Sequence, residues 1–132
     1  MLSDAECLAL LRGGAVGRIG LSVDALPVVL PVNYVVDGDR ILLRSGFGTK
    51  LAAALRNAVV CFEVDDIDER HHIGWSVLAT GTARELVGGE AARAATLSLR
   101  PWAPDVGDHL ISIDVELLSG RRICAARAAA TA

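Results

Sequence analysis

The chain of 132 residues has few aromatic residues, few cysteines and no strongly basic segment. Aromatic residues make up 4% of it, and its three cysteines (Cys7, Cys61 and Cys124) are scattered without CxxC spacing. An odd, dispersed set of cysteines argues against a disulfide framework and is typical of reduced thiols, so we expect a cytoplasmic protein. Cys61 lies in an apolar segment, which predicts a small core residue.

Two further absences narrow the classes of partner. The net charge is −3, and no run of lysine and arginine interleaved with aromatic residues occurs, which argues against nucleic acid. The apolar interior stretch without a charge at residues 25–36 is too short to cross a bilayer, and the N-terminus lacks a signal-peptide pattern. We therefore expect neither a nucleic-acid partner nor a membrane partner.

The length and the apolar content indicate one globular domain. Hydrophobic residues make up 52% of the chain and charged residues 22%. A chain of this size buries about 65–70% of its unfolded surface without a metal or a disulfide. We assign residues 1–124 to a single domain and residues 125–132 to a frayed alanine-rich tail. The high apolar content also favours a subunit interface.

Local signals predict hairpin-linked strands with short helices between them. Ser3 and Glu6 have the spacing of a capping box, and Gly13 with Gly14 ends that helix. A hairpin turn is expected at residues 37–39. Strands are expected over residues 15–23, 26–36, 40–45, 59–64 and 75–84 and near the C-terminus, and further helices over residues 50–56 and 88–100, with an acidic loop over residues 65–70.

Alternation of apolar and polar residues sets the expected strand faces. In the fifth strand, one face should carry Trp75, Val77, Ala79, Gly81 and Ala83. In the last strand, Ile111, Ile113, Val115 and Leu117 should point inward, and Ser112, Asp114 and Glu116 outward. The fold class is therefore mainly β, with six antiparallel strands in a barrel and three short helices.

The segment from Arg44 to Lys50 is the strongest candidate for a binding site. It joins a strand end, a glycine-containing loop and a helix start within seven residues. Free backbone N–H groups at a helix start attract anions, and a lysine there is unfavourable unless an anion is bound. Thr49 could add a hydroxyl group and Arg44 a second charge, so we interpret the segment as a phosphate site. A solvated lysine beside an ordinary glycine turn is the alternative.

The order and spacing of several motifs resemble the pyridoxamine 5′-phosphate oxidase-like family of FMN-binding split β-barrels, especially its short actinobacterial-type members. The resemblance covers about nine-tenths of the chain. The matching segments are residues 17–20, 26–33, 41–45, 48–51, 74–81, 101–102 and 119–123, together with the strand that ends at Glu63.

The resemblance implies a homodimer with FMN at the subunit interface. Residues 28–33 would run beside the flavin ring, with backbone groups at its pyrimidine edge. Arg44 and Ser45 would lie along the ribityl chain and ring, Thr49 and Lys50 would hold the phosphate, and Trp75 and Ser76 would come from the second subunit. The implied cofactor-binding residues are Val28, Leu30, Pro31, Val32, Asn33, Arg44, Ser45, Thr49, Lys50, Trp75 and Ser76.

Departures from the family pattern bear on the activity. Oxidases of the family carry an arginine–lysine pair where this chain has Thr49 and Lys50, and a glutamine where it has Ser76. No C-terminal basic apparatus for pyridoxal phosphate is found, which argues against a true pyridoxamine phosphate oxidase. The resemblance instead implies an FMN-dependent oxidoreductase acting on a small molecule, with nitro-compound reduction as one activity. Use of the deazaflavin coenzyme F-420, or non-catalytic flavin storage, are the alternatives.

Other motifs carry weaker functional signals. His71 and His72 lack a third ligand at a suitable spacing, so we expect loop-exposed histidines and no metal site. The acidic residues between Asp65 and Glu69 lack the glycine and final glutamate of a calcium loop. Trp102 is interpreted as a hydrophobic plug, with a ring-stacking wall as the alternative.

Overall fold

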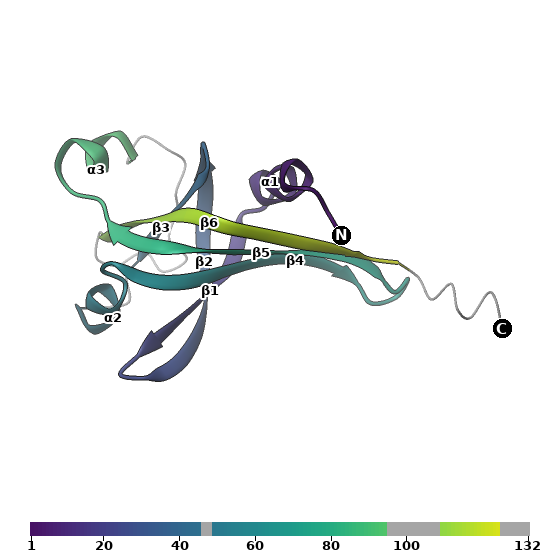
Figure 1. The fold of residues 1–132 in the computed structure, drawn as a ribbon, viewed down its shortest axis with the longest axis horizontal. Helices are drawn as coiled ribbons and strands as arrows, with labels where there is room; N and C mark the ends of the chain where they lie inside the picture. The colour runs from purple at the N-terminus through teal and green to yellow at the C-terminus, as the bar shows by residue number, and fades with distance from the viewer. Residues whose placement is uncertain (46–48, 95–108, 125–132) are drawn as a thin grey trace.

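The computed structural model describes residues 1–45, 49–94 and 109–124. Within these ranges the chain is mainly β, as predicted, with short helices at its corners (Figure 1). The elements are α1 (Asp4–Gly13), β1 (Val16–Val23), β2 (Leu26–Asp37), β3 (Arg40–Ser45), α2 (Thr49–Ala54), β4 (Ala58–Asp68), β5 (Ile73–Glu85), α3 (Gly88–Ala94) and β6 (His109–Ile123).

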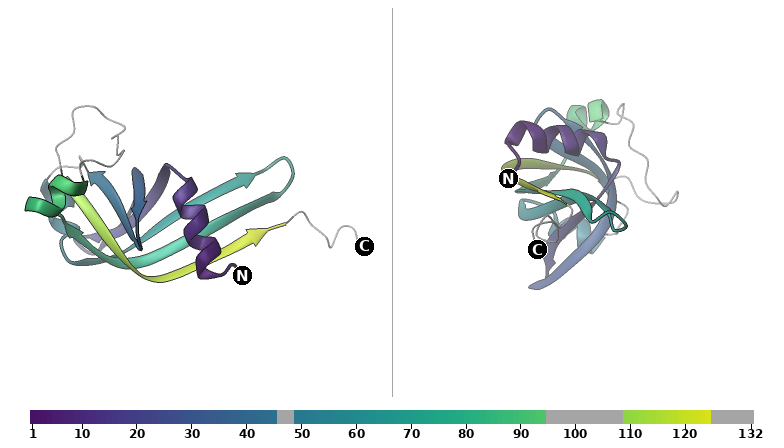
Figure 2. Two further views of the ribbon diagram at one scale, coloured as in Figure 1. Left: turned by 90° about the horizontal axis from the view of Figure 1, so that it is seen from above. Right: turned by 90° about the vertical axis from the view of Figure 1, so that its right-hand side faces the viewer.

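The six described strands form an antiparallel barrel in the order β1-β2-β3-β6-β5-β4, which β4 closes by pairing with β1. The closing pair is short, because only Arg18–Gly20 of β1 pairs with Cys61–Glu63 of β4. The β4–β5 ladder, by contrast, continues to the pair Asp68 and Ile73. As a result β4, β5 and β6 project beyond the closed part of the barrel (Figure 2).

Alternate strand residues fill the barrel interior. Phe62, Ile19, Leu43 and Val77 are fully buried, and Tyr34 packs edge-on against Phe62 with ring centroids 4.9 Å apart. Burying a side chain of this kind stabilises a fold by about 1.5–3 kcal/mol. The predicted inward face of β5 is confirmed, since Val77, Ala79, Gly81 and Ala83 are buried.

Helix α1 lies across the barrel and is tied to it by Tyr34. The predicted capping box is present, because Ser3 Oγ accepts from the N–H of Glu6 and the Glu6 carboxylate accepts from the N–H of Ser3. The hydroxyl of Tyr34 donates to the carbonyl of Leu11 at 2.5 Å. Cys7 and Leu11 are fully buried beneath the helix. The helix ends at Gly13, as predicted.

Two sequence-based predictions about β4 were wrong. The strand does not stop at Val64 but runs to Asp68, so most of the expected acidic loop is strand and the turn falls at residues 69–72. Pairing with the long strand β5 supplies hydrogen bonds that the local sequence does not reveal. Cys61 is not a core residue. It lies half-buried on the outer face, because its buried neighbours Val60 and Phe62 occupy the inner face.

The predicted faces of β6 hold only for its first half. Ile111 and Ile113 are buried, but Leu117 is 69% exposed. The register shifts between Thr80 and Gly81, because Thr80 pairs with Leu117 whereas Gly81 pairs with Val115. β6 therefore carries one extra residue at this point, and the residues beyond it point to the opposite face from the one predicted. Ser112, expected to be exposed, is fully buried on the outer side of the barrel, where it lies opposite Leu42.

A second hydrophobic cluster, outside the barrel, accounts for the burial of Ser112. Leu42, Leu86 and Leu110 form it, and Val35 and Ala91 of α3 pack against it. The described part of α3 ends at Ala94, so the predicted continuation to residue 100, Trp102 and the tail at residues 125–132 lie outside the described residues.

No helix in the described ranges is long and apolar enough to cross a membrane.

Candidate functional site

Strand β2 has an open edge along its first part. β1 pairs with it from Leu26 to Asn33, whereas β3 pairs with it only from Tyr34 to Asp37. Within the described residues, the stretch from Leu26 to Asn33 therefore has a neighbouring strand on one side only. Backbone N–H and C=O groups on such an edge are available to a ligand. We call this unpaired stretch between β2 and β3 the gap.

Asn33 and Arg44 lie at the point where β2 and β3 stop pairing. Tyr34 and Leu43 form the last pair of this ladder, and Asn33 and Arg44 are the next residue on each strand. Both residues are half-buried, out of phase with the inward-pointing Tyr34 and Leu43. Nε of Arg44 is buried and has no hydrogen-bond partner within the described part of the chain. A buried N–H without an acceptor is costly, so an acceptor group bound here would be favoured.

Helix α2 follows directly after this arginine. β3 ends at Ser45, and α2 begins at Thr49. Ala52 and Leu55 are almost fully buried, and α2 contacts β1. Figure 1 shows α2 at the same end of the barrel as the β1–β2 hairpin. The chain therefore brings the open edge, Arg44 and the start of α2 together. The side chains of Ser45, Thr49 and Lys50 lie outside the described part, so their role in phosphate binding stays a prediction.

The residues predicted on β2 divide by face. Val32 is buried, and Val28 and Leu30 pack against the main core. These three can meet a ligand only through their backbone, which is the role the resemblance implies. Pro31 is exposed on the other face and shares it with Asn33.

Trp75 and Ser76 are far from this group within one chain. Arg44 pairs with Leu110 near the start of β6, whereas Ser76 pairs with Arg121 near its end. At a rise of about 3.3 Å per residue, these positions are on the order of 30 Å apart along the strand. Consecutive side chains on a strand also point to opposite faces. Trp75 packs against the core cluster, so Ser76 faces outward.

Sequence reasoning missed a cluster of charged and polar residues around Ser76. The outward-facing Ser76 lines a hollow of about 360 Å³. Burial raises the pKa of Glu63 in this hollow, with a further contribution from Asp65, while Arg18 at 3.0 Å acts in the opposite direction. The cluster depends on the pairing of β4, β5 and β6, which the local sequence does not reveal. The residues lining the hollow are Met1, Glu63, Ser76, Leu78, Ser119, Gly120 and Arg121.

The histidine pair lies on the surface, as predicted. Nδ1 of His71 lies 2.7 Å from a carboxylate oxygen of Asp68, and both side chains are exposed. This contact and the backbone N–H groups of His71 and Arg70 lower the pKa of Asp68. His72 adopts a left-handed conformation with φ of 55° in the turn. The pair therefore serves the β4–β5 turn.

The comparisons with known proteins decide the family. The model for the family described as pyridoxamine 5′-phosphate oxidase matches residues 3–122. The chain belongs to the pyridoxamine 5′-phosphate oxidase family. The predicted resemblance is thereby confirmed, and the antiparallel barrel with its gap is consistent with the family's split β-barrel.

Several known proteins are similar to this chain in sequence or structure. An uncharacterized protein of Mycobacterium tuberculosis is 34% identical over 91% of this chain and 82% of its own length. An FAD-binding protein from Mycobacterium smegmatis is 35% identical, with a TM-score of 0.78 over 92% of this chain and 96% of that one. An FAD-binding protein from Mesorhizobium loti is 25% identical, with a TM-score of 0.74 over 92% and 95%.

Proposed function

We propose that this protein binds a flavin nucleotide in the gap between β2 and β3 and acts as an oxidoreductase on a small molecule. The observation that carries the proposal is the buried, unpartnered Nε of Arg44 beside Asn33 at the end of an open strand edge. The FAD-binding neighbours from Mycobacterium smegmatis and Mesorhizobium loti support a flavin in this fold.

In this proposal, each element around the gap contacts a different part of the flavin nucleotide. The open backbone edge of residues 26–33 offers hydrogen bonds to the polar edge of a flat ring. The guanidinium of Arg44 donates to an acceptor oxygen of the ring or its ribityl chain, and Thr49 and Lys50 hold a phosphate. The flavin supplies hydride or electron transfer, while the protein binds, orients and shields it. This division of labour explains why the sequence shows no nucleophile with an adjacent base.

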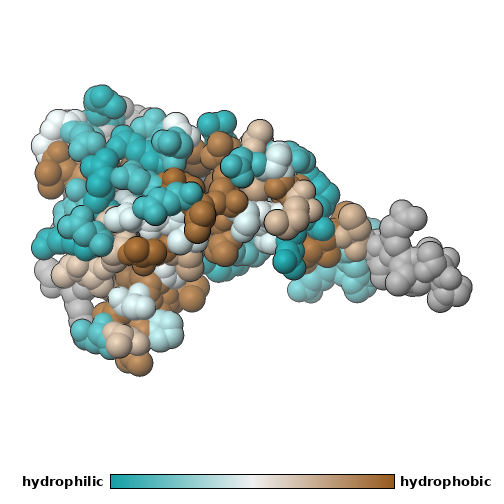
Figure 3. All heavy atoms as spheres, in the orientation of Figure 1, coloured by the Kyte–Doolittle hydropathy of each residue, from teal (hydrophilic) through white to brown (hydrophobic). Residues whose placement is uncertain are grey.

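We also propose that the site is completed by a second copy of the chain. Ser76 cannot reach the gap of its own chain. It lies on an outer face that also carries Leu78 (43% exposed), Val59 (71%) and Leu117 (69%). Exposed apolar residues gathered on one sheet face are typical of an interface. Figure 3 shows hydrophobic patches interspersed with hydrophilic residues on the face drawn there.

Two observations favour different flavin nucleotides. Lys50 matches the lysine of the family's arginine–lysine pair, with Thr49 in place of the arginine, and this favours FMN. The two solved neighbours named above bind FAD, which favours the larger nucleotide. The deazaflavin coenzyme F-420 would need further basic residues near the start of α2.

The binding test uses Arg44→Gln with Arg12→Gln as its matched control. Both variants remove one guanidinium, but Arg12 lies on α1 and bonds only to the carbonyl of Gly38 among the described residues. Titration with FMN, FAD and coenzyme F-420, followed by cofactor fluorescence, should show binding weakened at least about tenfold in Arg44→Gln and unchanged in Arg12→Gln. Equal affinity of the wild type and Arg44→Gln would place the flavin elsewhere.

Two further measurements test the activity and the assembly. Anaerobic reduction of the bound flavin by NADPH, followed by reoxidation with nitro compounds and other small acceptors, should show turnover. Flavin that is bound but never turned over would instead indicate storage. Sedimentation should show a dimer at micromolar concentration, and a monomer that keeps its flavin would contradict the shared site.

A further inference from the structure

The projecting ends of β4, β5 and β6 carry an uncovered continuation of the barrel interior. Val64 and Val77 are buried on the inner face of these strands. The next inward positions on each strand are Asp66, Trp75 and Arg122. Helix α1 covers this face as far as Gly120, where Sγ of Cys7 lies 2.7 Å from the place a β-carbon would occupy. Beyond that point a hollow of about 360 Å³ opens.

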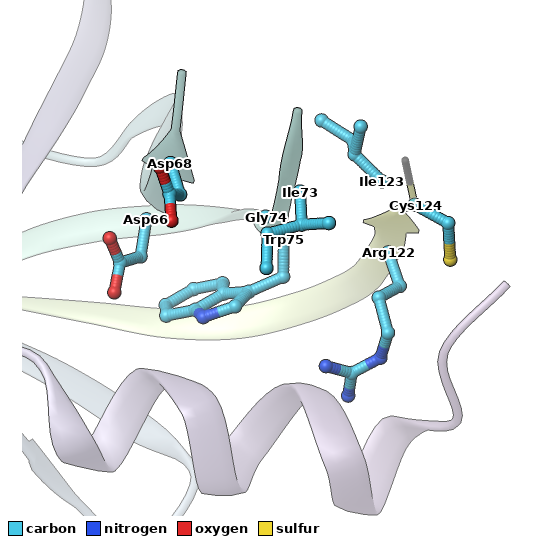
Figure 4. Close-up of a pocket in the computed structure, with 8 residues that line it drawn as sticks. All are labelled: Asp66, Asp68, Ile73, Gly74, Trp75, Arg122, Ile123 and Cys124. Carbon is cyan, nitrogen blue, oxygen red and sulfur yellow. The ribbon is translucent and has the colours of Figure 1, made fainter. Parts of the chain in front are cut away.

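Three of the lining residues stand side by side. Asp66 pairs with Trp75 across β4 and β5, and Trp75 pairs with Arg122 across β5 and β6. All three are in phase with the buried residues of their strands, so they share one face. Figure 4 shows the indole of Trp75 with the carboxylate of Asp66 on one side and the guanidinium of Arg122 on the other. Ile73 adds an apolar wall to the hollow.

The charges of this row are open to a ligand. Within the described ranges, the side chains of Asp66 and Arg122 make no hydrogen bond or ion pair with another residue. Asp68, on the same face, is already engaged with His71. The charge of Arg122 also lowers the pKa of Glu6 on α1, but it contributes less to that shift than the hydrogen bonds from Ser3. Asp66 and Arg122 are both exposed, and together they place opposite charges on either side of the half-buried Trp75.

We propose that this hollow binds a small flat zwitterion. Its aromatic or other planar body would stack on Trp75, its ammonium group would face Asp66, and its carboxylate or phosphate would face Arg122. Neighbouring strands lie about 4.8 Å apart, so the two charged side chains start about 10 Å from each other. That spacing suits charges at opposite ends of one ring and is too wide for both charges on one carbon.

The site is separate from the flavin gap. Arg122 lies near the end of β6, whereas Arg44 pairs with Leu110 near its start. The proposal assigns the side chain of Trp75 to this hollow and leaves the outward-facing Ser76 to the flavin of a second copy. It therefore stands whether or not the proposed flavin function is correct.

The test follows the fluorescence of Trp75 in a Trp102→Phe background, with 4-(aminomethyl)benzoate as the probe. Benzylamine and 4-methylbenzoate each keep the ring and one charge. We expect saturable quenching by the zwitterion and at least about tenfold weaker binding of each single-charge compound. Asp66→Asn and Arg122→Gln should each weaken the zwitterion by a similar factor.

The adjacent pair of arginines provides the control. Arg121 is the same residue type one position away, on the opposite face of β6, so Arg121→Gln should leave the affinity for the probe unchanged. Equal losses in Arg121→Gln and Arg122→Gln would overturn the proposal, as would the absence of saturable quenching. The probe should also bind equally before and after saturation with FMN or FAD. Competition with either nucleotide would place the probe in the flavin gap and overturn the proposal.

Discussion

Replacing Gly81 by alanine tests the irregular register between β5 and β6. Gly81 is buried on β5 at the irregularity that pairs it with Val115. A β-carbon at this position would lie 2.1 Å from the carbonyl oxygen of Asp114 and 2.8 Å from its carbonyl carbon. An ordinary contact needs about 3.4 Å, so the two strands would have to separate by more than 1 Å.

The size of the effect follows from which atoms must move. The obstruction is backbone of β6, which is held by the ladder on both sides of Gly81, and no flexible side chain can give way. Overpacking a core usually costs 1–3 kcal/mol, so we expect Gly81→Ala to lower the free energy of unfolding by about 3 kcal/mol or more. For a chain of this size, that loss lowers the melting temperature by on the order of 10 °C.

Gly13→Ala is the matched control. Gly13 is the last residue of α1 and has no atom within 4 Å of the place its β-carbon would occupy. Alanine is the better helix former by about 1 kcal/mol, so this variant should be as stable as the wild type or slightly more stable. Thermal and denaturant unfolding by circular dichroism, at one fixed protein concentration, should separate the two variants. A loss below about 0.5 kcal/mol in Gly81→Ala would refute the register at Gly81.

Two more substitutions test the attachment of α1 and the charge of the outer face. Burial raises the pKa of Tyr34 to about 12, so its hydroxyl stays protonated and donates to the carbonyl of Leu11. Tyr34→Phe should lower the free energy of unfolding, measured with denaturant, by about 1–3 kcal/mol. An unchanged free energy would contradict an anchoring role. The pKa of Glu63 is raised, so its ionisation destabilises the fold at neutral pH, and that penalty is absent well below the ordinary value of 4.5. Glu63→Gln should therefore be more stable than the wild type at pH 7, because the exposed partner Arg18 contributes little, and the difference should vanish as the pH falls well below 4.5. A difference that persists at low pH would refute this sign.

Features with local causes were predictable from the sequence. The capping box of Ser3 and Glu6 depends on residues three apart, and the turn at Gly38 depends on a residue that tolerates a φ of 65°. Alternation predicted the faces of β5, because residues two apart always share a face. The family motifs predicted the split barrel, while the binding role of the segment from Arg44 to the start of α2 stays a prediction.

Features that depend on pairing between distant segments were not predictable. The extra residue of β6 exchanges the faces of Leu117 and Leu118, and it exists only because β6 pairs with β5. The length of β4 and the outward position of Cys61 likewise depend on where β1 and β5 lie.

The sequence alone determined the residue types of the site and the local turns and helix starts that frame it. Only the tertiary structure decided that β2 keeps an open edge, that Nε of Arg44 is buried beside it, and that Trp75 and Ser76 face opposite ways. The physical reason is that a strand's hydrogen-bonding partner and the burial of its side chains are set by segments far along the chain, whereas propensity and spacing act over a few residues.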